Sequence, residues 1–252
     1  NGYEIYYLLQ GERNYFINDH TSYVKKGDIV LIDKNVLHKT IDTEKPAHER
    51  ILIEFKEKFL GNISDEIDDI KLYQCFKNNK RNVYSLDIEE QIWLEDNLFK
   101  ILQEKKKKKK GYILYIKVRL IEILIFLNRK SEQGLPSSLN FTDPLQQKIS
   151  EIASFINNNY SDKITLKLIA KKFGLSPSYL SKSFKNITGF NFVEYKNNVR
   201  VKEARRLLQE TDLNVTEIAS EVGYNNITHL GRIFKDITGY SPLKYRKLYR
   251  KG

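Results

Sequence analysis

The sequence has little cysteine, proline and tryptophan, and it has no methionine. Its 252 residues include one cysteine, five prolines and one tryptophan. A single cysteine, Cys75, excludes an intramolecular disulfide framework and fits a reducing compartment, so we expect a cytoplasmic protein. The chain opens without methionine in what reads as the middle of a strand, and we therefore expect its true N-terminus to lie upstream of Asn1.

The sequence also has no long hydrophobic run. Its most apolar segment, residues 112–127, is interrupted by Lys117, Arg119 and Glu122, and it is shorter than the ~20 residues that cross a bilayer. We therefore expect no membrane partner. The sequence contains no phosphate-binding glycine loop and no CxxC pair, and its four histidines do not have metal-ligand spacing. These absences exclude several common classes of nucleotide-binding, redox and metal-dependent enzyme.

Negative charge is scarce in the second half of the chain. The formal net charge is +11; residues 145–252 hold 19 Lys and Arg against 9 Asp and Glu, whereas residues 1–144 hold 24 against 23. Nearly all of the positive excess therefore lies in the last part of the chain. A basic segment of this kind is typical of a surface that binds phosphates of nucleic acid.

The same basic segment contains one pattern of apolar residues and glycines twice. In each copy, apolar residues at i, i+3, i+4 and i+7 form one face of a short helix, and a glycine follows where a left-handed residue ends a helix. A capping residue then starts a second helix; in the first copy it is Ser176, followed by Pro177. This order predicts two helix-turn-helix units. The repeated residues are Leu166, Ile169, Ala170, Phe173, Gly174, Leu180, Phe184 and Gly189, then Val215, Ile218, Ala219, Val222, Gly223, Leu230, Phe234 and Gly239.

The second helix of each copy is expected to present small or hydroxyl residues and two cations to solvent. These outward positions are Ser178, Ser181, Lys182 and Lys185 in the first copy, and Thr228, Gly231, Arg232 and Lys235 in the second. A face without acids and with small side chains can approach bases in the major groove. An ordinary solvated helix can also carry cations, but the same stripe in both copies favours DNA. We predict phosphate contacts for Lys185, Lys235 and Arg206, and base contacts for the other six positions.

Four stretches of residues 149–246 resemble the DNA-binding domain of the AraC/XylS family of bacterial transcription regulators. They are "ITLKLIAKKFGLSPSYLSKSFKNITG", "NVRVKEARRLL", "VTEIASEVGY" and "RIFKDITGYSPLKYR". The resemblance implies two helix-turn-helix units, joined by a long helix at residues 191–209, that enter successive major grooves of double-stranded DNA. It also implies RNA polymerase as a partner if the protein is an activator. One departure is His229-Leu230, where family members usually carry two aromatic residues.

Residues 3–60 have the short alternating runs and turn residues of a small β-barrel or sandwich. Their spacing resembles a cupin barrel, with Glu4 and Gly11 at the end of the first cupin motif and Gly27 and His38 within the second. In regulators that resemble this chain, such a barrel binds an organic effector. We predict that Tyr6, Tyr15 and His38 line the effector pocket, where they suit a sugar or an aromatic acid, and we expect no metal and no cofactor.

Residues 62–130 have helical periodicity and more apolar surface than one partner helix covers, which indicates a homodimer interface. Six consecutive lysines, residues 105–110, are expected to form a solvated loop between two helices. The sequence thus predicts an α+β protein: a cupin-like effector-binding barrel at residues 1–60, a helical dimerisation segment at 61–130, a Pro/Gly/Ser linker at 131–144, and an all-α DNA-binding domain at 145–252.

The prediction that best fits these observations is a sequence-specific transcription regulator that responds to a small molecule and is not an enzyme. One alternative is a cupin-type metal-dependent enzyme with a basic DNA-binding appendage; an HxH motif upstream of Asn1 would favour it. Another is an architectural protein that binds DNA without sequence preference. The small polar residues at 178, 181 and 228 argue against the architectural protein, because non-specific binding needs only cations.

Overall fold

The structure is a computed structural model that describes residues 2–44, 47–61, 71–77, 82–132 and 143–250. The chain divides into two compact units. The first comprises residues 1–15, 22–36 and 42–140, and the second comprises residues 16–21, 37–41 and 141–252. Sheets in the N-terminal part and helices in the C-terminal part confirm the predicted mixture of α and β structure. Most of the predicted linker at residues 131–144 lies outside the described residues, as do residues 62–70 of the predicted helical segment.

In the part of the chain that the structure describes, seven strands form two sheets. A four-stranded sheet has the order β6-β1-β4-β7, and a three-stranded sheet has the order β3-β2-β5. The closure of these sheets into one cupin-like barrel remains a prediction. The strands are β1 (Tyr3–Gln10), β2 (Glu12–Ile17), β3 (His20–Lys25), β4 (Asp28–Ile32), β5 (His38–Ile41), β6 (Glu49–Phe55) and β7 (Val83–Ser85).

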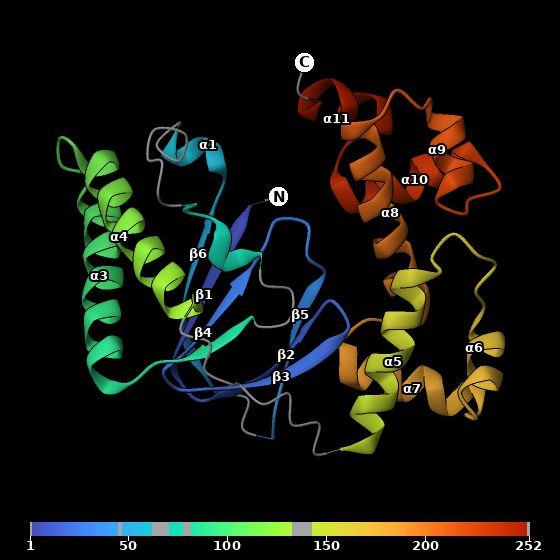
Figure 1. The fold of residues 1–252 in the computed structure, drawn as a ribbon, viewed down its shortest axis with the longest axis horizontal. Helices are drawn as coiled ribbons and strands as arrows, with labels where there is room; N and C mark the ends of the chain where they lie inside the picture. The colour runs from blue at the N-terminus through green and yellow to red at the C-terminus, as the bar shows by residue number, and fades with distance from the viewer. Residues whose placement is uncertain (1, 45–46, 62–70, 78–81, 133–142, 251–252) are drawn as a thin grey trace. The chain divides into compact units, whose positions relative to one another are not determined.

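The four-stranded sheet packs one face against a pair of helices (Figure 1). Strand β1 lies antiparallel between β4 and β6, with Ile5 opposite Leu31 on one side and Ile53 on the other. Because side chains alternate across a strand, Tyr3, Ile5 and Tyr7 share the face that joins the helical core. The pair is α3 (Ile88–Lys107) and α4 (Tyr112–Glu132). Two short helices of the same unit are α1 (Glu57–Leu60) and η1 (Gln74–Phe76).

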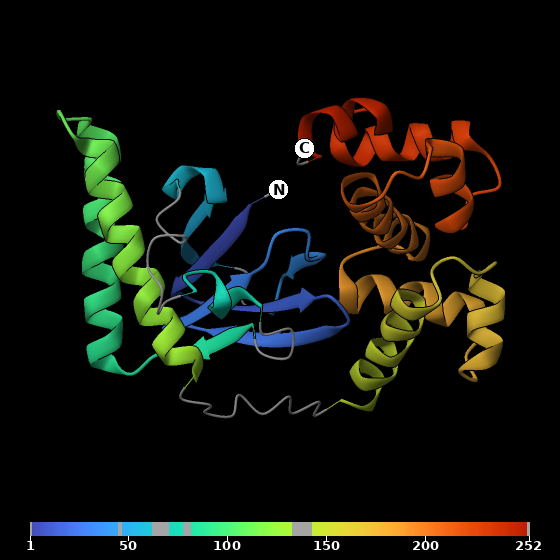
Figure 2. The ribbon, with the colours of Figure 1, turned by 45° about the horizontal axis from the view of Figure 1, so that its top comes forward.

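Helices α3 and α4 form a helical hairpin whose inner residues are buried (Figures 1 and 2). Helix α3 begins at a capping box in which Asp87 and Glu90 exchange side-chain and backbone hydrogen bonds. Its residues Leu94, Leu98 and Ile101 are buried, as predicted for its apolar face. Ile88 and Ile92 belong to the same helical apolar pattern, but they are 75% and 65% exposed. Within the described ranges, no helix is both long and apolar enough to cross a membrane.

The second unit contains seven described helices. The predicted connecting helix at residues 191–209 is α8, and Asn191 is its N-cap rather than its first residue. Figures 1 and 2 show one helix-turn-helix at each end of α8. The helices are α5 (Pro144–Asn158), α6 (Leu166–Lys172), α7 (Pro177–Thr188), α8 (Phe192–Glu210), α9 (Val215–Glu221), α10 (Ile227–Thr238) and α11 (Pro242–Tyr249).

Helix α8 contributes to two separate hydrophobic cores. Its first half supplies Phe192, Tyr195 and Val199 to a core that also holds α5, α6 and α7. Its second half supplies Val201, Ala204, Leu207 and Leu208 to a core formed with α9, α10 and α11. Phe16 from β2 is also buried in the first core. Each helix-turn-helix therefore has its own packing, and the shared helix fixes the distance between them.

Candidate nucleic-acid interface and ligand site

Helices α7 and α10 are started and stopped by equivalent residues. The Ser176 hydroxyl accepts a hydrogen bond from the Tyr179 backbone N–H at 3.2 Å, and the Asn226 side chain accepts one from the Thr228 N–H at 2.7 Å. Both helices end at a glycine with positive φ, 76° at Gly189 and 78° at Gly239. These contacts confirm the predicted starts and ends, and they satisfy backbone groups that helix ends otherwise leave unpaired.

The turn that follows each of these helices is built by a threonine. Thr188 Oγ1 donates to the Phe184 carbonyl oxygen at 2.7 Å and accepts from the Phe190 N–H at 3.1 Å. Thr238 makes the same two bonds with Phe234 and Tyr240, at 2.7 and 3.2 Å. The repeated sequence Ile-Thr-Gly thus encodes the same turn twice. As a result, α7 and α10 are held against their cores in the same way.

The predicted outward stripes are at the surface of both helices. Lys182, Lys185, Arg232 and Lys235 are exposed, and none of their four side chains has a hydrogen bond or ion pair with another residue in the described part of the chain. The smaller members of the stripe, Ser178, Ser181 and Thr228, are exposed, and Gly231 is half-buried. An exposed row of small residues with unneutralised cations can approach bases and phosphates without first breaking internal pairs.

Leu230 and His229 occupy the positions where the sequence departs from the resembled family. Leu230 is fully buried in the second core, as predicted, and His229 is exposed with its ring edge 5.2 Å from the Tyr224 ring centre. The second helix-turn-helix therefore keeps a complete core with leucine at this position.

Arg200 joins the two helix-turn-helix units. Its guanidinium is buried and donates to three backbone carbonyls: Tyr160 at 2.8 Å, Asp162 at 2.9 Å and Gly223 at 2.6 Å. It also lies over the Tyr224 ring, 5.1 Å from the centroid. Burial lowers the pKa of the guanidinium from its usual value, but an arginine stays charged in proteins.

Gly223 is required at this junction for steric reasons. Its φ is +82°, and a Cβ there would lie 2.3 Å from the Ser161 carbonyl oxygen and 2.7 Å from an Arg200 nitrogen. No side chain fits without moving the loop that precedes α6. The glycine predicted as a turn residue therefore also allows close contact between the two units.

Arg206, the third predicted phosphate contact, is engaged within its own helix. Its guanidinium pairs with Glu203 at 2.9 Å and with Glu210 at 3.0 Å, and these two carboxylates raise its pKa. The neighbouring Arg205 donates to the Tyr245 hydroxyl at 3.0 Å. A phosphate contact by Arg206 would have to compete with two carboxylates, unlike the free cations of α7 and α10.

The structure brings Tyr6 and Tyr15 together among charged groups. Their ring centroids are 5.2 Å apart at right angles, and the Tyr15 hydroxyl donates to Glu4 at 2.7 Å. Burial, and then the Glu4 carboxylate, raises the pKa of Tyr15, and the Arg50 guanidinium lies 5.6 Å from the centre of the Tyr6 ring. His38, the third predicted pocket residue, is half-buried and belongs to the second unit.

Two observations bear on the enzyme alternative. Burial raises the pKa of the Cys75 thiol to about 12, so this thiol is protonated and poorly nucleophilic. The described residues contain no group of three or more His, Cys, Asp or Glu side chains placed to hold a metal ion.

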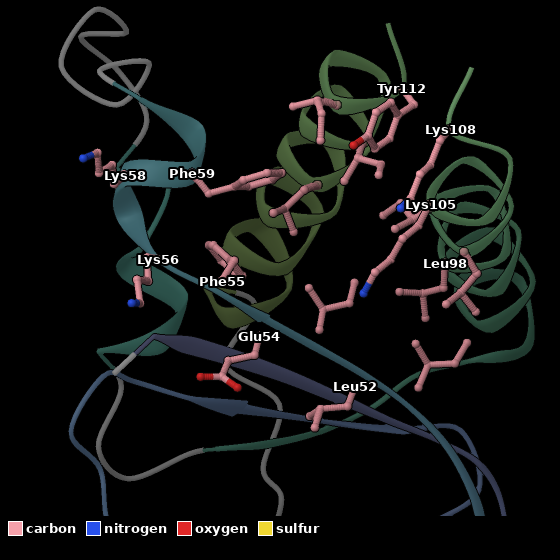
Figure 3. Close-up of a pocket in the computed structure, with 17 residues that line it drawn as sticks. Leu52, Glu54, Phe55, Lys56, Lys58, Phe59, Leu98, Lys105, Lys108 and Tyr112 are labelled. Carbon is pink, nitrogen blue, oxygen red and sulfur yellow. The ribbon is translucent and has the colours of Figure 1, made fainter. Parts of the chain in front are cut away.

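A cavity of about 760 Å³ lies in the first unit, between β6 with α1 and the half of the α3–α4 hairpin that is nearest its turn (Figure 3). Its walls are mainly apolar, with Phe55 and Phe59 on one side and Leu98 and Ile116 on the other. Lys105 and Lys108 also line it. The lysine run predicted as a solvated loop therefore continues α3 through Lys107 and contributes two side chains to a cavity. Helical periodicity, which places residues 98, 101 and 105 on one face, is the signal that could have indicated this.

Family models match both the N-terminal and the C-terminal part of this chain. The family model for the AraC-like ligand binding domain matches residues 1–124, and one for a helix-turn-helix domain matches residues 169–248. The Msm operon regulatory protein of Streptococcus mutans is 26% identical over 98% of this chain and 84% of its own length. The uncharacterized HTH-type transcriptional regulator YdiP of Escherichia coli is 28% identical over 99% of this chain and 80% of its own length. The C-terminal domain of AraT, a response regulator from Geobacillus stearothermophilus, is 30% identical and covers 44% of this chain and 92% of its own, with a TM-score of 0.42.

Proposed function

Because this chain belongs to the AraC family of DNA-binding transcription regulators, we propose that α7 and α10 are its two recognition helices. The observation that carries the proposal is the matched pair of exposed stripes, each with two cations that lack partners among the described residues. Helix α8, at 19 residues, is about 28 Å long, which suits two recognition helices separated by one ~34 Å turn of DNA. Selection of binding sequences from random double-stranded DNA tests this function, and recovery of no preferred sequence would contradict it.

Within each recognition helix, we assign base contacts and phosphate contacts to different residues. Base contacts fall to Lys182 and Arg232, whose side chains reach guanine, together with the small residues Ser178, Ser181, Thr228 and Gly231. Lys185 and Lys235 lie one turn nearer the helix C-terminus and contact phosphates. Arg206 is a weaker phosphate candidate because of its two carboxylate partners.

Removing Lys185 or Lys235 is expected to weaken binding to every DNA sequence by a similar factor. A phosphate contact releases condensed counterions, so each alanine variant should lower the slope of log affinity against log salt by about one. Fluorescence anisotropy at several salt concentrations measures this slope. Lys107→Ala removes the same charge outside the second unit and should leave the slope unchanged. A change in sequence preference in Lys185→Ala would show that this lysine reads bases instead.

The ligand-binding domain is proposed to sense a small organic effector, such as a sugar or an aromatic acid, within a cupin-like barrel. The cluster of Tyr6, Tyr15 and Glu4 offers hydroxyl and carboxylate groups to a polar ligand there. An effector acts on transcription only if it binds the DNA-competent arrangement with a different affinity from the alternative arrangement. RNA polymerase is the further partner if the regulator activates.

We also propose that the α3–α4 hairpin forms a homodimer interface. Its outward surface carries apolar side chains at positions where a solvent-exposed helix face normally has polar ones. The exposed members that do not line the cavity are Ile88, Ile92, Trp93, Phe99, Leu114, Tyr115 and Val118. Leu124 and the other inward residues of α4 belong to the core of the first unit, so they are unsuitable for testing this interface.

Changing Ile92 or Val118 to arginine is expected to shift the protein from dimer toward monomer. A charge in the centre of an apolar interface loses its hydration, whereas in the monomer both positions are exposed and tolerate it. Sedimentation velocity over a range of protein concentrations measures the change. Tyr23→Arg introduces the same charge at an exposed aromatic position on β3 and should leave the association state unchanged. A wild-type protein that stays monomeric at about 50 µM, well above typical dimer dissociation constants, would contradict the interface.

A further inference from the structure

We propose that the cavity between β6, α1 and the α3–α4 hairpin is a second ligand site, separate from the cluster around Tyr6 and Tyr15, and that it binds an apolar molecule with one anionic head group. The proposal rests on the effector-responsive regulator proposed above. It places the effector, or a second effector, outside the barrel on the helical side of the four-stranded sheet.

The size and walls of the cavity suit an apolar ligand body. Small-molecule sites in proteins typically measure ~300–1,000 Å³ and are lined mainly by hydrophobic side chains; this one measures about 760 Å³. Leu52, Leu102 and Ile113, all cavity residues, remain 46%, 43% and 43% exposed although the surrounding core is closely packed. Apolar side chains left accessible inside a concave site gain free energy when a ligand covers them.

The charged residues that line the cavity favour a ligand with an anionic group. Four lysines, residues 56, 58, 105 and 108, line the cavity against one carboxylate, Glu54. In Figure 3 Lys105 extends from α3 into the space facing β6, whereas Lys56 and Lys58 extend on the far side of β6 and α1. Neither the Lys105 nor the Lys108 side chain has a hydrogen bond or ion pair with any residue that the structure describes. Tyr112, also on the wall, can add a hydroxyl donor.

These features place the head group and the apolar body at opposite ends of the site. Lys105, Lys108 and Tyr112 lie at the end of α3 and the start of α4, where the hairpin turns. Ile51, Ile101 and Leu120 line the interior and are buried. A carboxylate or a phosphate monoester would meet the lysines at the hairpin turn, while an alkyl or aromatic body would lie against β6. Occupancy would thus fix the hairpin relative to the sheet, and the hairpin is the proposed dimer interface.

Isothermal titration of this 252-residue chain with dodecanoate, below its micelle concentration, tests the site without DNA. We expect dodecanoate and dodecyl phosphate to bind, and the neutral dodecanol and the cationic dodecyltrimethylammonium to bind at least about tenfold more weakly, as the loss of a charge-assisted contact requires. A phosphate that binds more tightly than the carboxylate would identify the head group as phosphate. Equal affinity for the anionic, neutral and cationic compounds, or no binding, would overturn the proposal.

Matched variants separate this site from general charge effects. Lys105→Gln with Lys108→Gln should reduce dodecanoate affinity about tenfold or more and leave dodecanol affinity unchanged. Lys107→Gln with Lys110→Gln removes the same charge from the same run at positions that do not line the cavity, and should change neither affinity. Ile113 is a partly exposed residue of the cavity wall. Ile113→Trp should fill part of the cavity and therefore weaken the binding of every dodecyl compound. An equal loss of dodecanoate affinity in the two double-lysine variants would overturn the proposal.

DNA binding is measured in parallel, so that the two failures can be told apart. If the selected DNA binds while dodecanoate does not, the regulator stands and the ligand site is wrong. If neither binds, both proposals are wrong. If the Lys105/Lys108 pair alters the sedimentation of the ligand-free protein but not dodecanoate binding, a second copy of the chain occupies the cavity, which also overturns the proposal.

Discussion

Replacement of Arg200 by alanine is expected to lower the free energy of unfolding of the second unit by about 3–5 kcal/mol. The guanidinium is 6% exposed and satisfies three carbonyl oxygens, those of Tyr160, Asp162 and Gly223. Each buried acceptor left without a donor costs about 1–3 kcal/mol, and partial entry of water keeps the total below the simple sum. The cation–π contact with Tyr224 is lost as well.

Urea denaturation followed by circular dichroism measures this change, fitted with separate transitions where the two units unfold separately. Arg206→Ala is the matched control, because Arg206 is on the same helix but exposed; its surface ion pairs are worth at most about 1 kcal/mol. Arg200→Lys keeps the charge but cannot reach three carbonyls in different directions, so it should also destabilise the unit. If Arg200→Ala were as stable as Arg206→Ala, the junction would be held by the hydrophobic cores alone.

Replacement of Arg232 by alanine is expected to cost about 1–3 kcal/mol of binding free energy at one half of the DNA site and to relax the base preference there. Lys182→Ala should have the same effect at the other half, because the two residues occupy equivalent positions of α10 and α7. Both side chains are exposed and lack partners among the described residues, so neither change should affect stability.

The decisive measurement combines these variants with DNA sites altered in one half at a time. A variant that has lost its base contact should no longer discriminate between the intact half and the altered half that it read, while discrimination at the other half is retained. If both variants lose discrimination at the same half, the arrangement of one helix per groove is wrong. Unchanged footprints and affinities in both variants would remove Lys182 and Arg232 from the base-contact assignment.

Much of the second unit could be predicted from the sequence because its signals are local. Ser176, Gly174 and Gly189 act through the backbone of their own turns, and the repeat supplied each signal twice. The connecting helix was placed to within one residue at each end, since Asn191 and Glu194 form a capping box that local sequence encodes. Buried positions such as Leu180 and Leu230 followed from helical periodicity in the same way.

Features that depend on contacts between distant residues could not be predicted. The three carbonyls that Arg200 binds come from two loops up to 40 residues away, so no local pattern distinguishes this arginine from the other arginines of the same helix. The outward direction of Ile88 and Ile92 depends on which face of α3 meets the sheet. The place of Lys105 and Lys108 in a cavity depends on how α3, α4 and β6 are assembled, and composition alone favoured a solvated loop.

The two separate cores along α8 also affect how the binding specificity of this protein can evolve. A substitution in the core around α10 is expected to leave the core around α7 largely unchanged, because the two cores share no fully buried residue among those that the structure describes. They are linked by the continuous helix, the Arg200 junction and the partly buried Tyr160. Distant, independent sites have nearly additive effects on free energy. A new base preference can therefore arise in one helix while the other helix continues to hold the ancestral half of the target. Regulators built in this way can acquire new target genes stepwise, without passing through a form that binds no DNA.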